Sequence, residues 1–174
     1  MSVVCEKDLN PPRFPMLYQL HYSIQHRTAA EEDISLYCAN MQGVDMDLTA
    51  YIMVIFQKGI VLYGEEIPKV FQAPTRKDYL DSVWDDIEDS TTRITKDPVS
   101  TILNLCRTLA YVREEIILSK KEGGELAQEH LSQRYYQMLE SVLSAYRTGV
   151  ALVPTSLMAQ FVEECLAELA EDIV

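Results

Sequence analysis

Apolar residues recur at helical spacing through most of the second half of the chain, and the clearest stripe lies between residues 97 and 115. Asp97 followed by Pro98 is a strong helix start, because an aspartate can cap the free amides and proline suits the first helical position. The stripe predicted to face the core of this helix consists of Ile102, Leu105, Cys106, Leu109 and Val112.

Five further segments combine apolar periodicity with helix start or stop signals. Ser119 and Glu122 have the spacing of a capping box, and Gly149 is a natural helix end. The helices predicted from these signals cover residues 47–58, 76–90, 120–131, 133–147 and 155–171. A series of helices joined by short links is typical of a helical bundle.

The N-terminal part of the chain has a different pattern. Residues 2–5 read as a short strand, and three prolines in NPPRFP interrupt it. Apolar and polar residues then alternate in LYQLHYS, as in a half-buried strand. Two short strands alone do not form a stable sheet, so we expect a missing sheet upstream. The predicted fold class is mainly α: a helical bundle of about five to six helices with a short N-terminal β segment.

Three polar features stand out against this helical pattern. Gly123 and Gly124 lie in a first helical turn, where each costs about 1 kcal/mol relative to alanine, so we expect close approach by another backbone or a ligand. Arg107 flanks the apolar stripe and is predicted to be a surface arginine, a member of a buried ion pair or a phosphate contact. The acidic patch of Asp85, Asp86, Glu88 and Asp89 is predicted to be a solvated helix face.

Composition narrows the classes of partner. The chain has 174 residues, a net charge of -12 and a pI of about 4.6. This acidity repels the phosphates of nucleic acids and would attract a polycationic small molecule, so no nucleic-acid partner is expected. No apolar run approaches the about 20 residues of a membrane span, and no signal peptide is visible. Scattered cysteines, without disulfide or zinc spacing, suit a cytoplasmic protein.

Familiar catalytic motifs are absent from the sequence. Phosphate-binding glycine loops, a serine nucleophile elbow and a zinc-protease motif do not occur, and the three histidines are isolated. Asp45 and Asp47 form a D-x-D pair that in some enzymes holds Mg²⁺. Without a Gly-Ser turn before them, we interpret them as helix-capping carboxylates. No catalytic residue and no metal ligand is therefore predicted in this chain.

Four stretches in order carry a resemblance to a known family. In LNLCRTLAYVREEIILSKKEGGE, the matching positions are Leu103, Arg107, Tyr111, Ser119, Lys120, Gly123 and Gly124. NPPRFPMLYQLHYS, VDMDLTAYIMVIFQKGIVLYGEEI and VFQAPTRKDYLDSVWDDIED add further similarity. Together they resemble the C-terminal helical domain of aminoglycoside nucleotidyltransferases, the streptomycin 3″- and spectinomycin 9-adenylyltransferases, over nearly the whole chain.

The resemblance implies a reaction shared between two domains. In a complete member, ATP and Mg²⁺ would sit on an N-terminal catalytic domain, and a base would deprotonate a drug hydroxyl that attacks the α-phosphate. In the helical domain, Lys120 and Tyr146 are the expected nucleotide-binding residues, and Glu114, Glu115 and Lys121 the expected substrate-binding residues. Without the resemblance, the same side chains read as a solvated lysine, a core tyrosine and exposed charges.

The sequence departs from the family pattern where the catalytic motifs should lie. The Gly-Ser and Asp-x-Asp elements of the catalytic domain are absent. Residues 1–35 are therefore predicted to be a remnant of the nucleotidyltransferase sheet and its linker. Residues 36–174 are predicted to be a helical substrate-binding domain, inactive alone and without a cofactor of its own. Leu109 and Leu126 replace aromatic residues common in the family, which bears on aminoglycoside specificity.

The resemblance leaves one alternative function of another class. The chain would then be a stand-alone helical module for protein interaction or oligomerisation, a pseudoenzyme whose inherited pocket is unused. Candidate partners are an aminoglycoside under the first hypothesis and a second copy, bound through exposed N-terminal strands, under the second.

Overall fold

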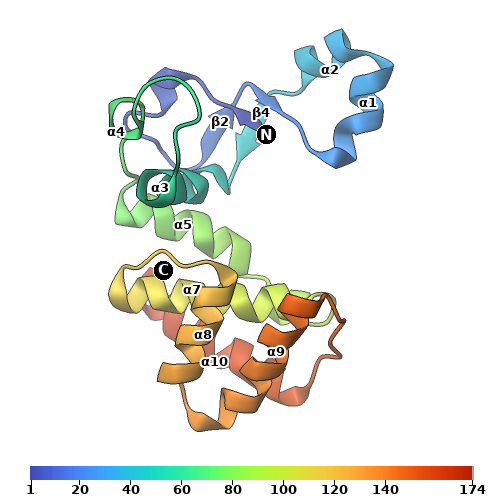
Figure 1. The fold of residues 1–174 in the computed structure, drawn as a ribbon, viewed down its shortest axis with the longest axis vertical. Helices are drawn as coiled ribbons and strands as arrows, with labels where there is room; N and C mark the ends of the chain where they lie inside the picture. The colour runs from blue at the N-terminus through green and yellow to red at the C-terminus, as the bar shows by residue number, and fades with distance from the viewer. Residues whose placement is uncertain (174) are drawn as a thin grey trace. The chain divides into compact units, whose positions relative to one another are not determined.

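The computed structural model describes residues 1–173 and shows a mainly helical chain with short N-terminal strands, which confirms the predicted fold class. Its contacts divide the chain into two compact units, Met1–Val83 and Trp84–Val174 (Figure 1). Helix α5 (Arg76–Ile87) begins in the first unit and ends in the second. The boundary predicted at residue 35 follows from the family resemblance and stays a prediction.

Two small antiparallel sheets lie at the centre of the first unit. Strand β1 (Ser2–Val3) pairs with β3 (Leu20–His21), and β2 (Met16–Tyr18) pairs with β4 (Gly43–Asp45). The segment LYQLHYS thus contributes to two strands rather than one, because its first half pairs in one sheet and its second half in the other.

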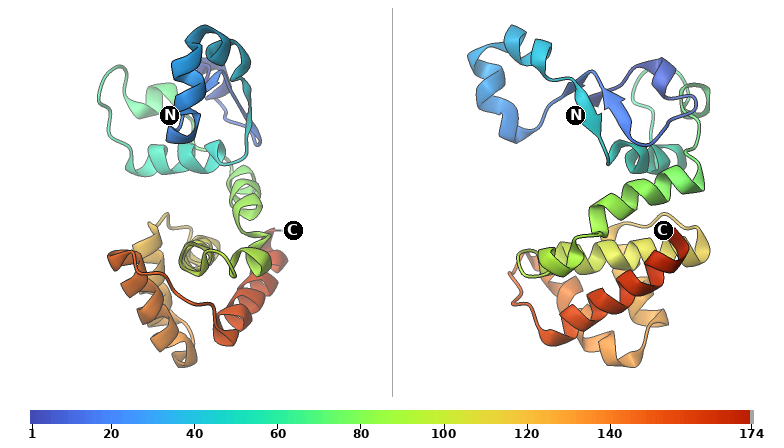
Figure 2. Two further views of the ribbon diagram at one scale, coloured as in Figure 1. Left: turned by 90° about the vertical axis from the view of Figure 1, so that its right-hand side faces the viewer. Right: turned by 180° about the vertical axis from the view of Figure 1, so that it is seen from behind.

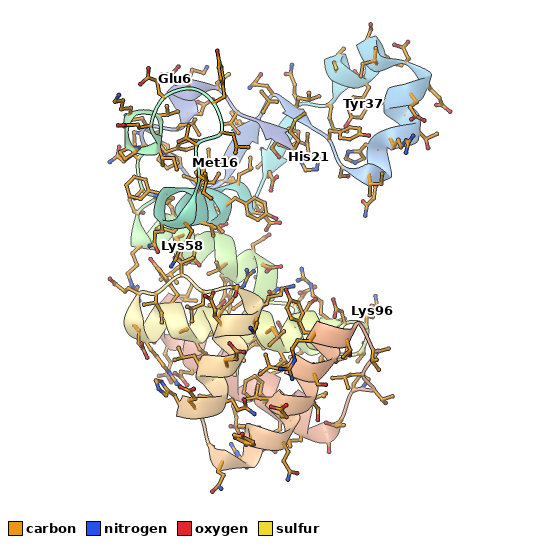
Figure 3. The ribbon with its side chains drawn as sticks, in the orientation of Figure 1. Glu6, Met16, His21, Tyr37, Lys58 and Lys96 are labelled. Atoms are coloured by element: carbon orange, nitrogen blue, oxygen red, sulfur yellow. The ribbon has the colours of Figure 1, made fainter. Side chains whose placement is uncertain are left out.

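Short helices and a small core complete the first unit. The helical segments are η1 (Glu6–Asp8), η2 (Ile24–His26), α1 (Arg27–Glu32), α2 (Ile34–Asn40), α3 (Leu48–Lys58) and α4 (Ile67–Val70). Met16 of β2 lies over α3 (Figure 3) and forms the core with Leu9, Leu48 and Ile52. Burial of these apolar side chains holds the sheet containing β2 against α3.

The second unit is a helical bundle (Figure 2). Its elements are α6 (Ser90–Arg93), α7 (Pro98–Glu114), α8 (Lys120–His130), η3 (Gln133–Tyr135), α9 (Tyr136–Thr148) and α10 (Ser156–Ile173). The stripe predicted on α7 faces the core, where it packs with Leu139 of α9 and Phe161 of α10. Fully buried side chains on three helices therefore fix the position of α7.

Capping side chains begin the helices close to the predicted positions. Asp97 accepts a 3.0 Å hydrogen bond from a first-turn amide of α7. Ser119 and Glu122 form a reciprocal capping box at α8: Ser119 N donates to Glu122 Oε2 at 2.8 Å, and Glu122 N donates to Ser119 Oγ at 3.2 Å. Before α3, the predicted capping by the D-x-D pair is not made, because Asp47 at the N-cap forms no side-chain capping hydrogen bond. The carboxylate of Asp45 instead accepts from the amide of Asp47 at 2.9 Å, in the turn that leads into the helix.

Candidate functional site

The first turns of α8 lie directly against α7 at two glycines. A Cβ atom at Gly123 would lie 2.9 Å from the N, Cα and Cβ atoms of Arg107, and one at Gly124 would lie 2.6 Å from Leu103 Cδ2. The close approach expected from the sequence is therefore made by another backbone, that of α7. Because Lys120 lies one turn before Gly123, this contact sets the start of α8 beside the middle of α7.

The link between α7 and α8 brings the chain back alongside α7 before α8 begins (Figure 1). Glu115 ends α7 in a left-handed conformation, with a φ of 56°. Glu114 at the end of α7 lies 3.7 Å from His130 at the end of α8, measured from Oε1 to Nδ1. Gly123 and Arg107, which also contact each other, precede His130 and Glu114 on their respective helices. The two helices therefore run in the same general direction.

Charged side chains from α5, α6, α7 and α8 meet near this contact. Asp86 Oδ1 accepts from Arg93 Nη1 at 3.0 Å, and Asp86 Oδ2 accepts from Arg107 Nη2 at 3.4 Å. Lys120 and the capping residue Asp97 lie near enough to these groups to change one another's proton affinity. We call Asp86, Arg93, Asp97, Arg107 and Lys120 the charge cluster.

Two pKa shifts describe the electrostatics of the charge cluster. Burial, followed by the positive charge of Arg107, lowers the pKa of Lys120, although Asp86 and Asp97 oppose this. Burial would raise the pKa of Asp97, but hydrogen bonds from Ser100 and the charge of Lys120 lower it. At the half-buried Lys120 ammonium, repulsion and desolvation thus outweigh attraction. A further anion at that position would relieve this imbalance.

Tyr146 lies at the same end of the α8–α9 pair as Lys120. Gln128, near the end of α8, donates to a carboxylate oxygen in the first half of α9 at 3.1 Å. Near the start of α8, a Cβ atom at Gly124 would lie 2.7 Å from Leu143 Cδ2 in the second half of α9. The helices are therefore antiparallel. Tyr146 is 46% exposed, so it is not the core tyrosine that the sequence alone allows.

The three candidate substrate-binding residues are all exposed, but they do not share one location. Glu114 pairs with His130 in the last turn of α8, which lies about 15 Å along that helix from Lys120. Glu115 ends α7, whereas Lys121 follows Lys120 and forms an ion pair of 3.7 Å with a glutamate one turn on. Their predicted roles stay predictions.

Asp86 and Arg93 belong to the charge cluster although the sequence did not single them out as functional. The predicted solvated face is wrong for Asp86, which accepts bonds from Arg93, Asn104 and Arg107. One sequence signal could have indicated this: Asp86 follows the buried Tyr79 by seven residues and the buried Val83 by three, so it borders the buried stripe of α5. Helical neighbours of a buried stripe often lie partly within the protein.

Residues 1–173 contain neither a cluster of metal-ligating side chains nor a membrane-spanning helix. No group of three or more His, Cys, Asp and Glu side chains in that range is arranged to hold a metal ion. Across the same range, no helix is both long and apolar enough to cross a bilayer.

The geometry is suited to binding an extended anion with an aromatic group. Arg107 and Lys120 lie beside a helix N-terminus, and guanidinium and ammonium groups in that setting bind phosphate oxygens. Tyr146 presents an exposed ring at the same end of α8 and α9. Exposed aromatic rings stack on nucleobases.

Comparisons with known proteins identify relatives of this chain. Residues 69–172 match the family model for the C-terminal domain of aminoglycoside adenylyltransferase. The chain is also similar to the crystal structure of spectinomycin adenyltransferase AAD(9) from Enterococcus faecialis with ATP and spectinomycin. That match has a TM-score of 0.75 and 16% identity, and covers 97% of this chain and 67% of the other. No curated protein sequence matches the chain.

Proposed function

The chain belongs to the aminoglycoside adenylyltransferase family, whose C-terminal domain it contains, and on this premise we propose that it forms the helical, substrate-binding part of an enzyme that transfers AMP from ATP to an aminoglycoside hydroxyl. The observation that carries the proposal is the meeting of Arg107 and Lys120 at the start of α8. Triphosphate oxygens bound there would offset the burial and repulsion that lower the pKa of Lys120.

The adenine end of the nucleotide is assigned to Tyr146. This side chain is exposed and lies at the Lys120 end of the α8–α9 pair, which supports binding of one ATP molecule by both groups. Stacking of a base on an aromatic ring contributes about 1–3 kcal/mol. The phosphates and the base would thus bind to separate helices of one rigid bundle.

The aminoglycoside is assigned to the acidic end of α7. Glu114 and Glu115 are exposed there, and carboxylates form charge-assisted hydrogen bonds with the cationic groups of aminoglycosides. Lys121 would contact oxygen atoms of the drug from the first turn of α8. The solved relative was crystallised with spectinomycin and ATP, which supports this substrate class.

We further propose that this chain does not transfer AMP by itself. In the reaction, a deprotonated hydroxyl oxygen forms a bond to the α-phosphorus while the bond to the leaving pyrophosphate breaks. The sequence contains neither the Gly-Ser turn nor the Asp-x-Asp strand with which the family holds ATP and Mg²⁺. The described residues would contribute binding and orientation only. We also propose a cytoplasmic location, because the reaction depends on ATP.

Titration calorimetry with the purified chain tests this assignment. We expect ATP to bind in the millimolar range or tighter, and the affinity to fall as salt rises because the contacts are largely ionic. Spectinomycin and streptomycin are titrated in parallel. Transfer of labelled AMP to either drug is expected to remain undetectable with Mg²⁺ present.

Two outcomes would contradict the proposal. Turnover by this chain would show that its residues form a complete active site. Failure to bind ATP and both drugs, together with a dimer in sedimentation experiments, would favour the alternative of a helical self-association module.

A matched pair of tyrosine substitutions tests the assignment of the adenine. Tyr146→Ala is expected to weaken ATP binding roughly tenfold, because stacking on the base is lost. Tyr136→Ala is the control, since Tyr136 is 51% exposed on the same helix but lies at its opposite end. ATP affinity and thermal unfolding are measured for both variants. Equal loss of affinity in the two would remove Tyr146 from the site.

A further inference from the structure

Asp86 connects three helices through one carboxylate. Its Oδ1 atom accepts from Arg93 Nη1 at 3.0 Å, and its backbone oxygen accepts from the same nitrogen at 2.6 Å. Its Oδ2 atom accepts from Asn104 Nδ2 at 2.8 Å and from Arg107 Nη2 at 3.4 Å. The end of α5 is thereby fixed to α6 and α7 at the point where α8 begins.

Asn104 reinforces this arrangement at an energetic cost. Its side chain is 7% exposed, and its Oδ1 atom is buried without a hydrogen-bond partner among the described residues. Turning the amide over would place an oxygen against the Asp86 carboxylate, so the amide is held in one orientation.

Arg107 is held differently from a structural arginine on the same helix. Arg113 donates from Nε and Nη2 to the carboxylate of Glu168 at 2.8 and 2.9 Å, which engages a whole edge of the guanidinium. Arg107 meets Asp86 through Nη2 alone. Its Nη1 and Nε groups have no ionic partner among residues 1–173, so they remain able to bind another anion.

We propose that Asp86 is a positioning residue of the nucleotide site, a role that rests on the proposed function. It holds Arg107 and Arg93 by their Nη atoms, with Asn104 fixing the carboxylate, and so directs the remaining N–H groups of Arg107 toward phosphate oxygens beside Lys120. Asp86 itself does not touch the nucleotide. It acts through Arg107.

Substitutions of Asp86 separate positioning from simple charge neutralisation. If Asp86 only neutralised nearby cations, Asp86→Asn would strengthen ATP binding and Asp86→Glu would leave it unchanged. Positioning predicts weaker binding in both, by roughly tenfold, which is the lower end of the loss when partners that orient metal ligands are removed. Asp86→Glu keeps the charge and so gives an answer even if Asp86→Asn does not fold. Circular dichroism and thermal unfolding check the fold.

Asp89 provides the matched control. It binds Arg93 Nε at 2.8 Å and carries the same charge, but its contact is with Arg93 and not with Arg107. Asp89→Asn is expected to leave ATP affinity unchanged or to raise it slightly.

A double-mutant cycle then tests whether Asp86 acts through Arg107. Arg107→Gln should weaken ATP binding in the wild-type chain and change it little in an Asp86→Glu background. Additive effects would overturn the inference, as would unchanged affinity in both Asp86 variants. If the wild-type chain does not bind ATP at all, the proposed nucleotide site itself is wrong.

Discussion

Replacing Gly123 by alanine is expected to destabilise the helical unit by about 2 kcal/mol and to weaken ATP binding. The new methyl group would lie 2.9 Å from three atoms of Arg107, two of them in the backbone, so α8 must move away from α7. Overpacking of this kind costs about 1–3 kcal/mol, and only part is offset by the better helix propensity of alanine. The shift would also separate Lys120 from Arg107.

Gly124→Ala is the control for this substitution. Its methyl group would lie 2.6 Å from Leu103 Cδ2 and 2.7 Å from Leu143 Cδ2, which are the ends of side chains, so small side-chain shifts relieve the contact without moving a backbone. The gain in helix propensity, about 1 kcal/mol, offsets most of that strain. Urea unfolding and ATP titration of both variants measure the difference. If the two alanines were equally harmful, backbone contact at Gly123 would not be what positions α8.

Lys120→Met is expected to reduce ATP affinity by about tenfold or more while leaving stability unchanged or slightly higher. A charge-assisted hydrogen bond to phosphate is worth about 1.5–3 kcal/mol, which corresponds to this loss. Methionine retains much of the length of lysine without its charge. Burial and Arg107 lower the pKa of Lys120, so its positive charge is unfavourable in the free protein. The substitution removes this charge, which is why stability is not expected to fall.

The pH dependence of stability provides an independent readout at Lys120. Its pKa in the folded chain lies below the value of 10.5 expected when unfolded, so between the two values the unfolded chain binds more protons. The free energy of unfolding of the wild type therefore increases as pH rises through this window. The Lys120→Met variant should not show this increase. ATP affinity of the wild type should fall over the same window as the ammonium loses its proton.

Lys77→Met is the control for loss of a lysine charge. Lys77 is 80% exposed in the other unit, where it pairs with Asp81 at 2.8 Å. Its substitution should leave ATP affinity unchanged. A similar loss of affinity in the Lys77 and Lys120 variants would indicate a general effect of net charge.

Local signals in the sequence were sufficient to predict the start of α8. Ser119 and Glu122 lie three residues apart, and a capping box depends only on that spacing. The unfavourable Gly-Gly pair in the first turn similarly indicated a close contact, and the structure identifies the backbone at Arg107 as the neighbour. These predictions succeed because the residues that determine the local structure lie within about one helical turn of it.

The role of Asp86 could not be predicted in the same way. Its partners Asn104 and Arg107 lie on another helix, and the spacing between α5 and α7 along the chain carries no signature of their contact. On α5 itself, Asp86 is one of several acidic residues, for which a solvated face is the simplest interpretation. LYQLHYS illustrates the same limit, because alternation predicts a strand without specifying its partner.

The returning link between α7 and α8 also bears on how the proposed site would form during folding. The contacts of Gly123 and Gly124 with α7 fall within the single stretch 97–131, so closing this loop requires little chain entropy. Contacts between residues close in sequence tend to form early and fast. Arg107 and Lys120 would therefore be brought together by contacts of short sequence separation, which favours their meeting early in folding.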